Sequence, residues 1–80
     1  MYIKTNTYNK ITTFGKNKIY YYLTVSEYQT ETDMDNFENA TNEFSFQYNL
    51  DKVDPTKDVM LQIYELLLQE PQFSGGTLIQ

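Results

Sequence analysis

The sequence predicts an α+β domain, a three- or four-stranded antiparallel sheet with one C-terminal helix packed on one face. Two segments, residues 19–28 and 43–50, alternate apolar and polar side chains, which is typical of strands. Residues 54–70 instead carry apolar side chains at the spacing of a helix. Three antiparallel strands need one buried face, and a single helix can cover it.

The N-terminal third predicts strands joined by a hairpin. Residues 2–14 are rich in β-branched and aromatic types and indicate one long strand or two short ones. Gly15–Lys18 is expected to form the turn, because Gly and Asn tolerate positive φ. In the strand over 19–28, one face is apolar and the other is aromatic and polar. The apolar face carries Ile19, Tyr21, Leu23 and Val25.

The C-terminal half predicts one strand and one helix. Residues 29–42 have no strong period and are expected to be turns. The strand over 43–50 places Phe44, Phe46, Tyr48 and Leu50 on one face. The helix is expected to begin with Asp54 as N-cap and Pro55 at its first position, and to end near Glu70. Its apolar stripe is Met60, Ile63, Tyr64 and Leu67.

The composition excludes several kinds of function. The 80-residue chain contains no Cys, His, Trp or Arg, and its formal net charge is −5. There is therefore no thiol or imidazole for catalysis or for a Cys/His metal site, and we expect no enzyme activity and no cofactor. An acidic chain without Arg also argues against direct binding of nucleic acid. No apolar run approaches the roughly 20 residues of a membrane span, and the first residues lack the apolar core of a signal peptide.

Charge is unevenly distributed along the chain. Residues 1–26 contain four Lys and no acidic residue, whereas residues 27–80 contain eleven acidic residues and two Lys. The acidic run after the hairpin is the best candidate for binding a partner with a basic surface, where spaced carboxylates can imitate phosphates. Its candidate residues are Glu31, Asp33, Asp35 and Glu38.

Two other interpretations of this acidic run stay open. The acids simply fill a solvated loop, or three of them at alternate positions from Glu31 belong to a calcium loop. The sixth and twelfth positions of such a loop, Asn36 and Asn42, are not the Gly and Glu that it requires, which argues against calcium.

Aromatic residues supply a second candidate surface. Tyr20, Tyr22 and Tyr28 lie on the strand face that one helix would leave uncovered. Tyrosine offers a large contact area and a hydroxyl that tolerates water, so these residues, with Phe37, are expected to anchor a partner. The alternatives are that the tyrosines only reflect β propensity, or that they stack on bases, which the net acidity opposes.

The last residues are expected to be a tail, residues 74–80, after a domain of residues 1–73. Thr77, Leu78 and Ile79 follow two glycines and can add a strand to a sheet edge, within the chain or on a neighbouring copy. The other interpretation is a frayed terminus. The second form of strand addition makes these residues candidates for self-association.

The C-terminal sequence, from Tyr64-Glu65-Leu66-Leu67 to the Pro71–Gly76 segment, resembles the end of some small uncharacterised proteins encoded by phages. The resemblance covers roughly the last 20 residues and implies a phage or mobile-element origin, in line with the many residues that use AT-rich codons. The expected function is a stoichiometric inhibitor of a host defence or nucleic-acid-processing protein, acting in the cytoplasm of a bacterial host. The alternative is a virion structural or assembly component that self-associates.

Overall fold

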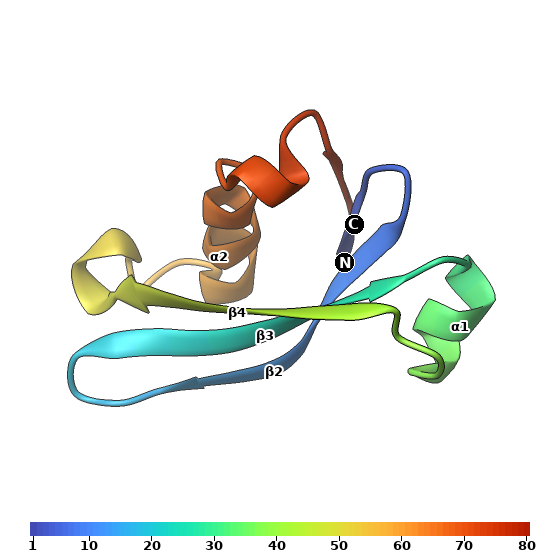
Figure 1. The fold of residues 1–80 in the computed structure, drawn as a ribbon. Coiled ribbons are helices and arrows are strands. Elements are labelled where there is room, and N and C mark those ends of the chain that lie inside the picture. Colours follow the sequence, from blue (N-terminus) through green and yellow to red (C-terminus); the bar gives the residue numbers. More distant parts are fainter.

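The computed structural model describes residues 1–80 and contains one five-stranded antiparallel sheet with two α-helices (Figure 1). The strand order is β4-β3-β2-β1-β5. The α+β prediction is confirmed, but the sheet is larger than expected and there are two α-helices instead of one. The elements are β1 (Tyr2–Lys4), β2 (Tyr8–Lys16), β3 (Tyr20–Tyr28), α1 (Glu31–Asn36), β4 (Asn42–Asn49), α2 (Val59–Leu67) and β5 (Thr77–Ile79), with 3-10 turns at Leu50–Lys52 and Pro71–Phe73.

The predicted β2–β3 hairpin is present, and Asn17 and Lys18 lie in its turn as expected, but Gly15 and Lys16 belong to β2. The strand β2 continues through Gly15, which pairs with Tyr22. The turn follows at Asn17, whose side-chain oxygen accepts hydrogen bonds from the backbone N–H groups of Ile19 (2.8 Å) and Tyr20 (2.9 Å). Gly15 is needed for space, because a Cβ there would collide with the Tyr22 ring. Ile19, expected in the core, is 68% exposed because it lies in this turn.

The core lies between the sheet and α2. The predicted residues Tyr21, Leu23 and Val25 of β3 are buried there, and so are the α2 residues Ile63, Tyr64 and Leu67. Three further members come from segments that carry no clear period: Ile3, Val53 and Phe73. The β4 side chains Phe44, Phe46 and Tyr48 pack against this core but stay half-buried, since β4 is at the edge of the sheet.

The helix α2 begins later than predicted. Its N-cap is Asp58, whose side chain accepts a hydrogen bond from the Leu61 N–H at 3.0 Å. Asp54 instead holds a turn, because its carboxylate accepts from both the N–H (2.9 Å) and the hydroxyl (2.6 Å) of Thr56. These two hydrogen bonds lower the pKa of Asp54. The expected N-cap therefore stabilises the connection before the helix.

The two chain ends lie side by side in the sheet (Figure 1). The C-terminal strand β5 pairs antiparallel with β1, with Ile3 opposite Leu78. The segment expected as a tail therefore adds a strand within its own chain. On the other side of β1, the buried Asn9 side chain donates to the Ile3 carbonyl at 3.2 Å and joins β1 to β2.

The small helix α1 was not predicted, and it covers one end of the second sheet face. It packs against β2 and β3, and its buried residue is Met34. Tyr28, on the same face of β3 as Tyr20 and Tyr22, is 2% exposed. Because α1 covers only this end, the rest of the face stays uncovered.

Candidate partner-binding surface

The most unusual residue of the surface is Phe37, which ends α1. The helix begins at Thr30, whose hydroxyl accepts from the Asp33 N–H at 3.1 Å. At the other end, the N–H of Phe37 donates to the Met34 carbonyl (3.2 Å), and the N–H of Glu38 donates to the Asp33 carbonyl (2.9 Å). This pair of bonds is a Schellman motif, and it requires a left-handed residue, which is usually Gly. Phe37 occupies that position with φ 53°.

The ring of Phe37 is also poorly buried. It is 59% exposed, and the Nζ of Lys10 lies 5.2 Å from its centroid. A left-handed backbone is rare for bulky residues and is unfavourable, and an exposed aromatic ring gains little from burial. The fold thus gains little from a Phe at this position.

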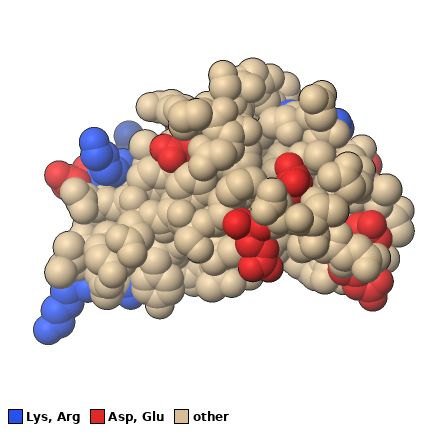
Figure 2. Space-filling view, viewed as in Figure 1, with Lys and Arg blue, Asp and Glu red and all other residues tan.

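Four acidic residues lie on α1 or directly after it, close to Phe37 in the sequence. Glu31, Asp35 and Glu38 are exposed, and the half-buried Asp33 accepts a hydrogen bond from the Asn39 side chain at 3.3 Å. Figure 2 shows a group of acidic side chains over α1, and basic side chains both near the hairpin turn and on the α1 side of the molecule. We call Glu31, Asp35, Phe37 and Glu38 the acidic patch.

Two residues of the acidic patch also affect the ionisation of Tyr2 in β1. The pKa of Tyr2 is raised, first by desolvation and then by electrostatic interaction with Glu31, Tyr8 and Asp35. All three acids with calcium-loop spacing lie within the short helix α1, and no three acidic side chains come together as metal ligands.

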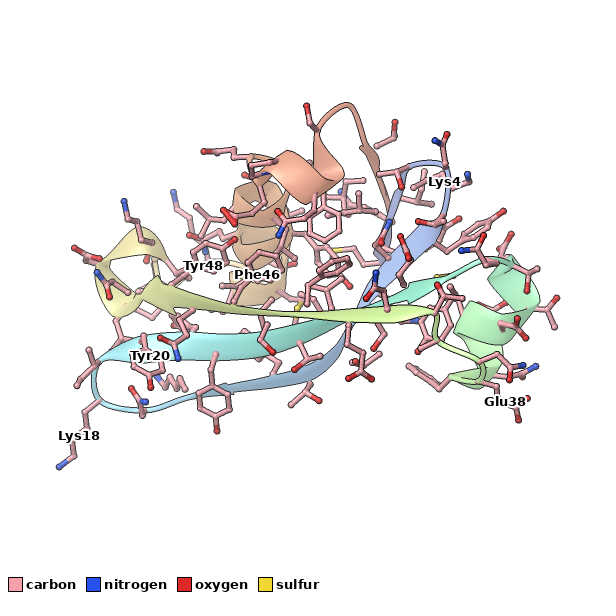
Figure 3. All side chains as sticks on the ribbon, in the orientation of Figure 1. Lys4, Lys18, Tyr20, Glu38, Phe46 and Tyr48 are labelled. Atoms are coloured by element: carbon pink, nitrogen blue, oxygen red, sulfur yellow. The ribbon has the colours of Figure 1, made fainter.

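The predicted tyrosine anchors do not form one surface with the acidic patch. Tyr22 is 43% exposed and Tyr20 is half-buried, at the hairpin end of β3. The expectation that Tyr28 is accessible is wrong, because α1 covers it. Tyr22 and Tyr28 are six positions apart along the strand, which is roughly 20 Å. Figure 3 shows this separation, with Tyr20 and Lys18 at one end of the sheet and Glu38 at the other.

The candidate self-association residues lie in β5. Ile79 is 37% exposed, while Leu78 is half-buried against the core. One side of β5 pairs with β1, and its other side is an edge of the sheet. The strand pairing of β5, which contains Thr77, Leu78 and Ile79, is therefore made within the protein's own sheet.

The sequence predicted Phe37 and its acidic neighbours as site residues, but it did not predict the helix α1 that brings them together. One signal was available, since Thr30 followed three residues later by Asp33 resembles the start of a helix. No signal pointed to Lys10, which is distant in sequence and reaches Phe37 only because β2 lies beside α1.

The remaining features of the surface concern pockets and membrane spans. The surface has no pocket, and neither helix has the length and apolar character needed to cross a bilayer. Comparison of the chain with protein-family models, with curated proteins and with solved structures gives no match.

Proposed function

We propose that the protein is a small, non-catalytic binding module that inhibits a partner stoichiometrically through the acidic patch. The partner is a protein with a basic surface, such as a host defence or nucleic-acid-processing protein. In this proposal a phage or mobile element encodes the chain, and the protein acts in the cytoplasm of a bacterial host.

The observation that carries the proposal is Phe37, an aromatic side chain held outward at a strained position. Strained residues persist where the surrounding structure enforces them, and they are frequent at binding sites. A partner that buries this ring recovers the apolar burial that the free protein lacks. The carboxylates of Glu31, Asp35 and Glu38 in the acidic patch would then pair with Lys or Arg and speed association.

Capture from a bacterial lysate with matched variants tests the proposal. Wild-type protein is expected to retain a basic host protein that elutes as the salt concentration rises. Asp35→Lys with Glu38→Lys is expected to lose it, and so is Phe37→Gly. The control is Asp51→Lys with Glu65→Lys, which makes the same change of charge at exposed positions outside the patch.

The captured protein is then assayed with increasing amounts of wild type and of each variant. Inhibition that saturates at a fixed molar ratio, and that the patch variants lack, is the expected result. Equal capture by the patch variants and the control would remove the acidic patch from the proposal. Asp33 is left unchanged, because its hydrogen bond to Asn39 contributes to the end of α1.

A virion or assembly component is the second candidate function. The uncovered sheet face near Tyr20 and Tyr22, together with the exposed Ile79 of β5, favours it. It predicts an assembly that survives high salt and that involves residues 77–79.

A further inference from the structure

The strand β4 forms the longer of the two sheet edges and lacks the usual protection against pairing. It has eight residues, no Pro and no Lys, and its pairing with β3 is continuous from Asn42 to Asn49 without a bulge. Natural edge strands are usually short, charged, bulged or covered. The opposite edge, β5, has only three residues. Figure 1 shows β4 at the front of the sheet with no element beyond it.

The outward backbone groups of β4 can be assigned from its inner hydrogen bonds. The N–H of Leu50 donates to the Ile19 carbonyl on the β3 side at 3.2 Å. Since inward and outward groups alternate along an antiparallel strand, the odd-numbered residues point away from β3. The free N–H and C=O groups therefore belong to Glu43, Ser45, Gln47 and Asn49.

We propose that a second copy of this chain covers this edge, by antiparallel pairing of β4 with β4 about a two-fold axis. A two-fold axis through Phe46 brings outward groups opposite outward groups, as hydrogen bonding requires. Ser45 then lies opposite Gln47 of the second copy, and Glu43 lies opposite its Asn49. The two five-stranded sheets become one continuous sheet.

The side chains of β4 are self-complementary in this register. Phe46 meets Phe46 of the second copy on the axis, and Phe44 meets its Tyr48. Cross-strand aromatic pairs of this kind stabilise sheets. These three side chains rise from β4 toward the α2 side, as Figure 3 shows for Phe46 and Tyr48, and they are half-buried in the single chain. The second copy would cover their remaining exposed surface.

Charge does not oppose the pairing locally. Glu43 is the one charged residue of β4. In this register the two Glu43 side chains lie six residues apart along the strands, roughly 20 Å. Each copy still carries a net charge of −5, so the dimer is expected to strengthen as salt screens this repulsion. Binding of a basic partner by the acidic patch is expected to weaken as the salt concentration rises. The two proposals therefore have opposite salt dependence, and an experiment can reject one without rejecting the other.

A charge-pair experiment tests both the edge and the register. Ser45→Lys with Gln47→Lys places like charges opposite each other across the interface, and so does Ser45→Glu with Gln47→Glu. Each double variant alone is expected to be a monomer by sedimentation equilibrium. Wild type is expected to form a weak dimer, with half of the chains paired at a protein concentration between about 10 µM and about 1 mM. An equimolar mixture of the two variants is expected to restore a dimer, because every Lys then faces a Glu.

A control and a measurement on the unmodified chain keep the test decisive. The control, Asn6→Lys with Thr13→Lys, adds the same charge at exposed positions away from β4 and is expected to dimerise. In wild type, amide exchange at Glu43, Ser45, Gln47 and Asn49 is expected to slow as the protein concentration rises. Any of three results would overturn the proposal. Wild type could be a monomer throughout this range, an edge variant could dimerise alone, or the amide exchange rates of these four residues could be independent of protein concentration.

Discussion

At Phe37, the residue that the proposed function requires is not the residue that would make the fold most stable. Its left-handed backbone suits Gly, and its ring is mostly exposed. Phe37→Gly is therefore expected to raise the free energy of unfolding by about 0.5–1 kcal/mol, while it removes the anchor of the acidic patch. Urea unfolding measures the first effect.

The matched control for Phe37 is Asn39→Gly. Asn39 also has a positive φ, of 59°, but Asn tolerates this conformation. Its replacement relieves little strain and also removes the hydrogen bond to Asp33, so it is expected to leave stability unchanged or to lower it. A Phe37→Gly variant that is less stable than wild type would show that the ring contributes to the fold.

Tyr48 should control part of the stability at alkaline pH. Its hydroxyl is buried without a hydrogen-bond partner, and desolvation, followed by the charge of Glu70, raises its pKa from 10.0 to about 12. Because the folded-state pKa is higher than the unfolded one, the fold favours the neutral hydroxyl. The resulting stability is full below pH 10 and is lost as the pH rises through about 12.

Tyr48→Phe is accordingly expected to show a shallower loss of stability than wild type between pH 10 and 12. At neutral pH it is expected to be at least as stable, since the lost hydroxyl makes no hydrogen bond. Unfolding curves at a series of pH values measure both effects, and Tyr22→Phe at an exposed position is the control. A steeper alkaline loss in Tyr48→Phe would contradict the assignment.

Among the elements, α2 is connected to the sheet by one hydroxyl as well as by its apolar stripe. The Tyr64 hydroxyl accepts from the Ile11 N–H at 2.9 Å and donates to the Met1 carbonyl at 3.1 Å. Ile11 lies beyond the last β2 residue that pairs with β1, so Tyr64 replaces the missing strand neighbour. Burial raises the pKa of this hydroxyl, and the Ile11 hydrogen bond partly offsets that effect.

Tyr64→Phe keeps the ring but leaves the Ile11 N–H unsatisfied. We expect it to lower the free energy of unfolding by about 1–3 kcal/mol. Amide exchange at Ile11 should become faster in the variant. Unchanged stability and unchanged exchange would mean that water or the backbone replaces the hydroxyl at no cost.

The caps of α2 give a second prediction for an element. Asp58→Ala removes the side chain that accepts from Leu61 and is expected to cost about 1 kcal/mol of stability. Asp54→Ala removes only a turn and is expected to cost less. Urea unfolding of the two variants ranks them, and the reverse order would support the N-cap predicted from sequence.

These elements show which parts of the fold the sequence could predict. The β4 strand was expected at 43–50 and is found at Asn42–Asn49, because its clean alternation reflects one half-buried face. The predicted start of α2 was wrong because both Asp54-Pro55 and Asp58 have the residue types of a helix start. Which of them begins the helix depends on tertiary packing. The six-residue α1 is too short to show a helical period, so the compact acidic patch could not be foreseen, although its residues were.

At the scale of the whole molecule, the uneven charge of the sequence is only partly separated in space, because Lys10 lies against Phe37 of the acidic patch. The acidic residues of α1 lie at one end, and Lys16 and Lys18 lie at the hairpin end. The uncovered sheet face and the β4 edge lie between these ends. A basic partner at α1 and a second copy at β4 would therefore use different parts of one small protein.

Removal of residues 77–80 distinguishes the two ways in which copies could associate. The strand β5 pairs with β1 along its whole length, and β1 has only two pairs with β2. Loss of β5 also uncovers Ile3, which is fully buried, and removes the packing of Leu78. We expect the truncated chain to lose about 2 kcal/mol or more of stability, measured by urea unfolding.

The mass of the truncated chain is then measured where it is still folded. If copies pair through β4, the truncated chain remains a dimer at high protein concentration, because the opposite edge of the sheet is unchanged. If they associate through β5, as a virion component that uses Thr77, Leu78 and Ile79 would, the same deletion yields a monomer. The mass of the folded truncated protein therefore decides which edge of the sheet joins two copies, independently of the cost to stability.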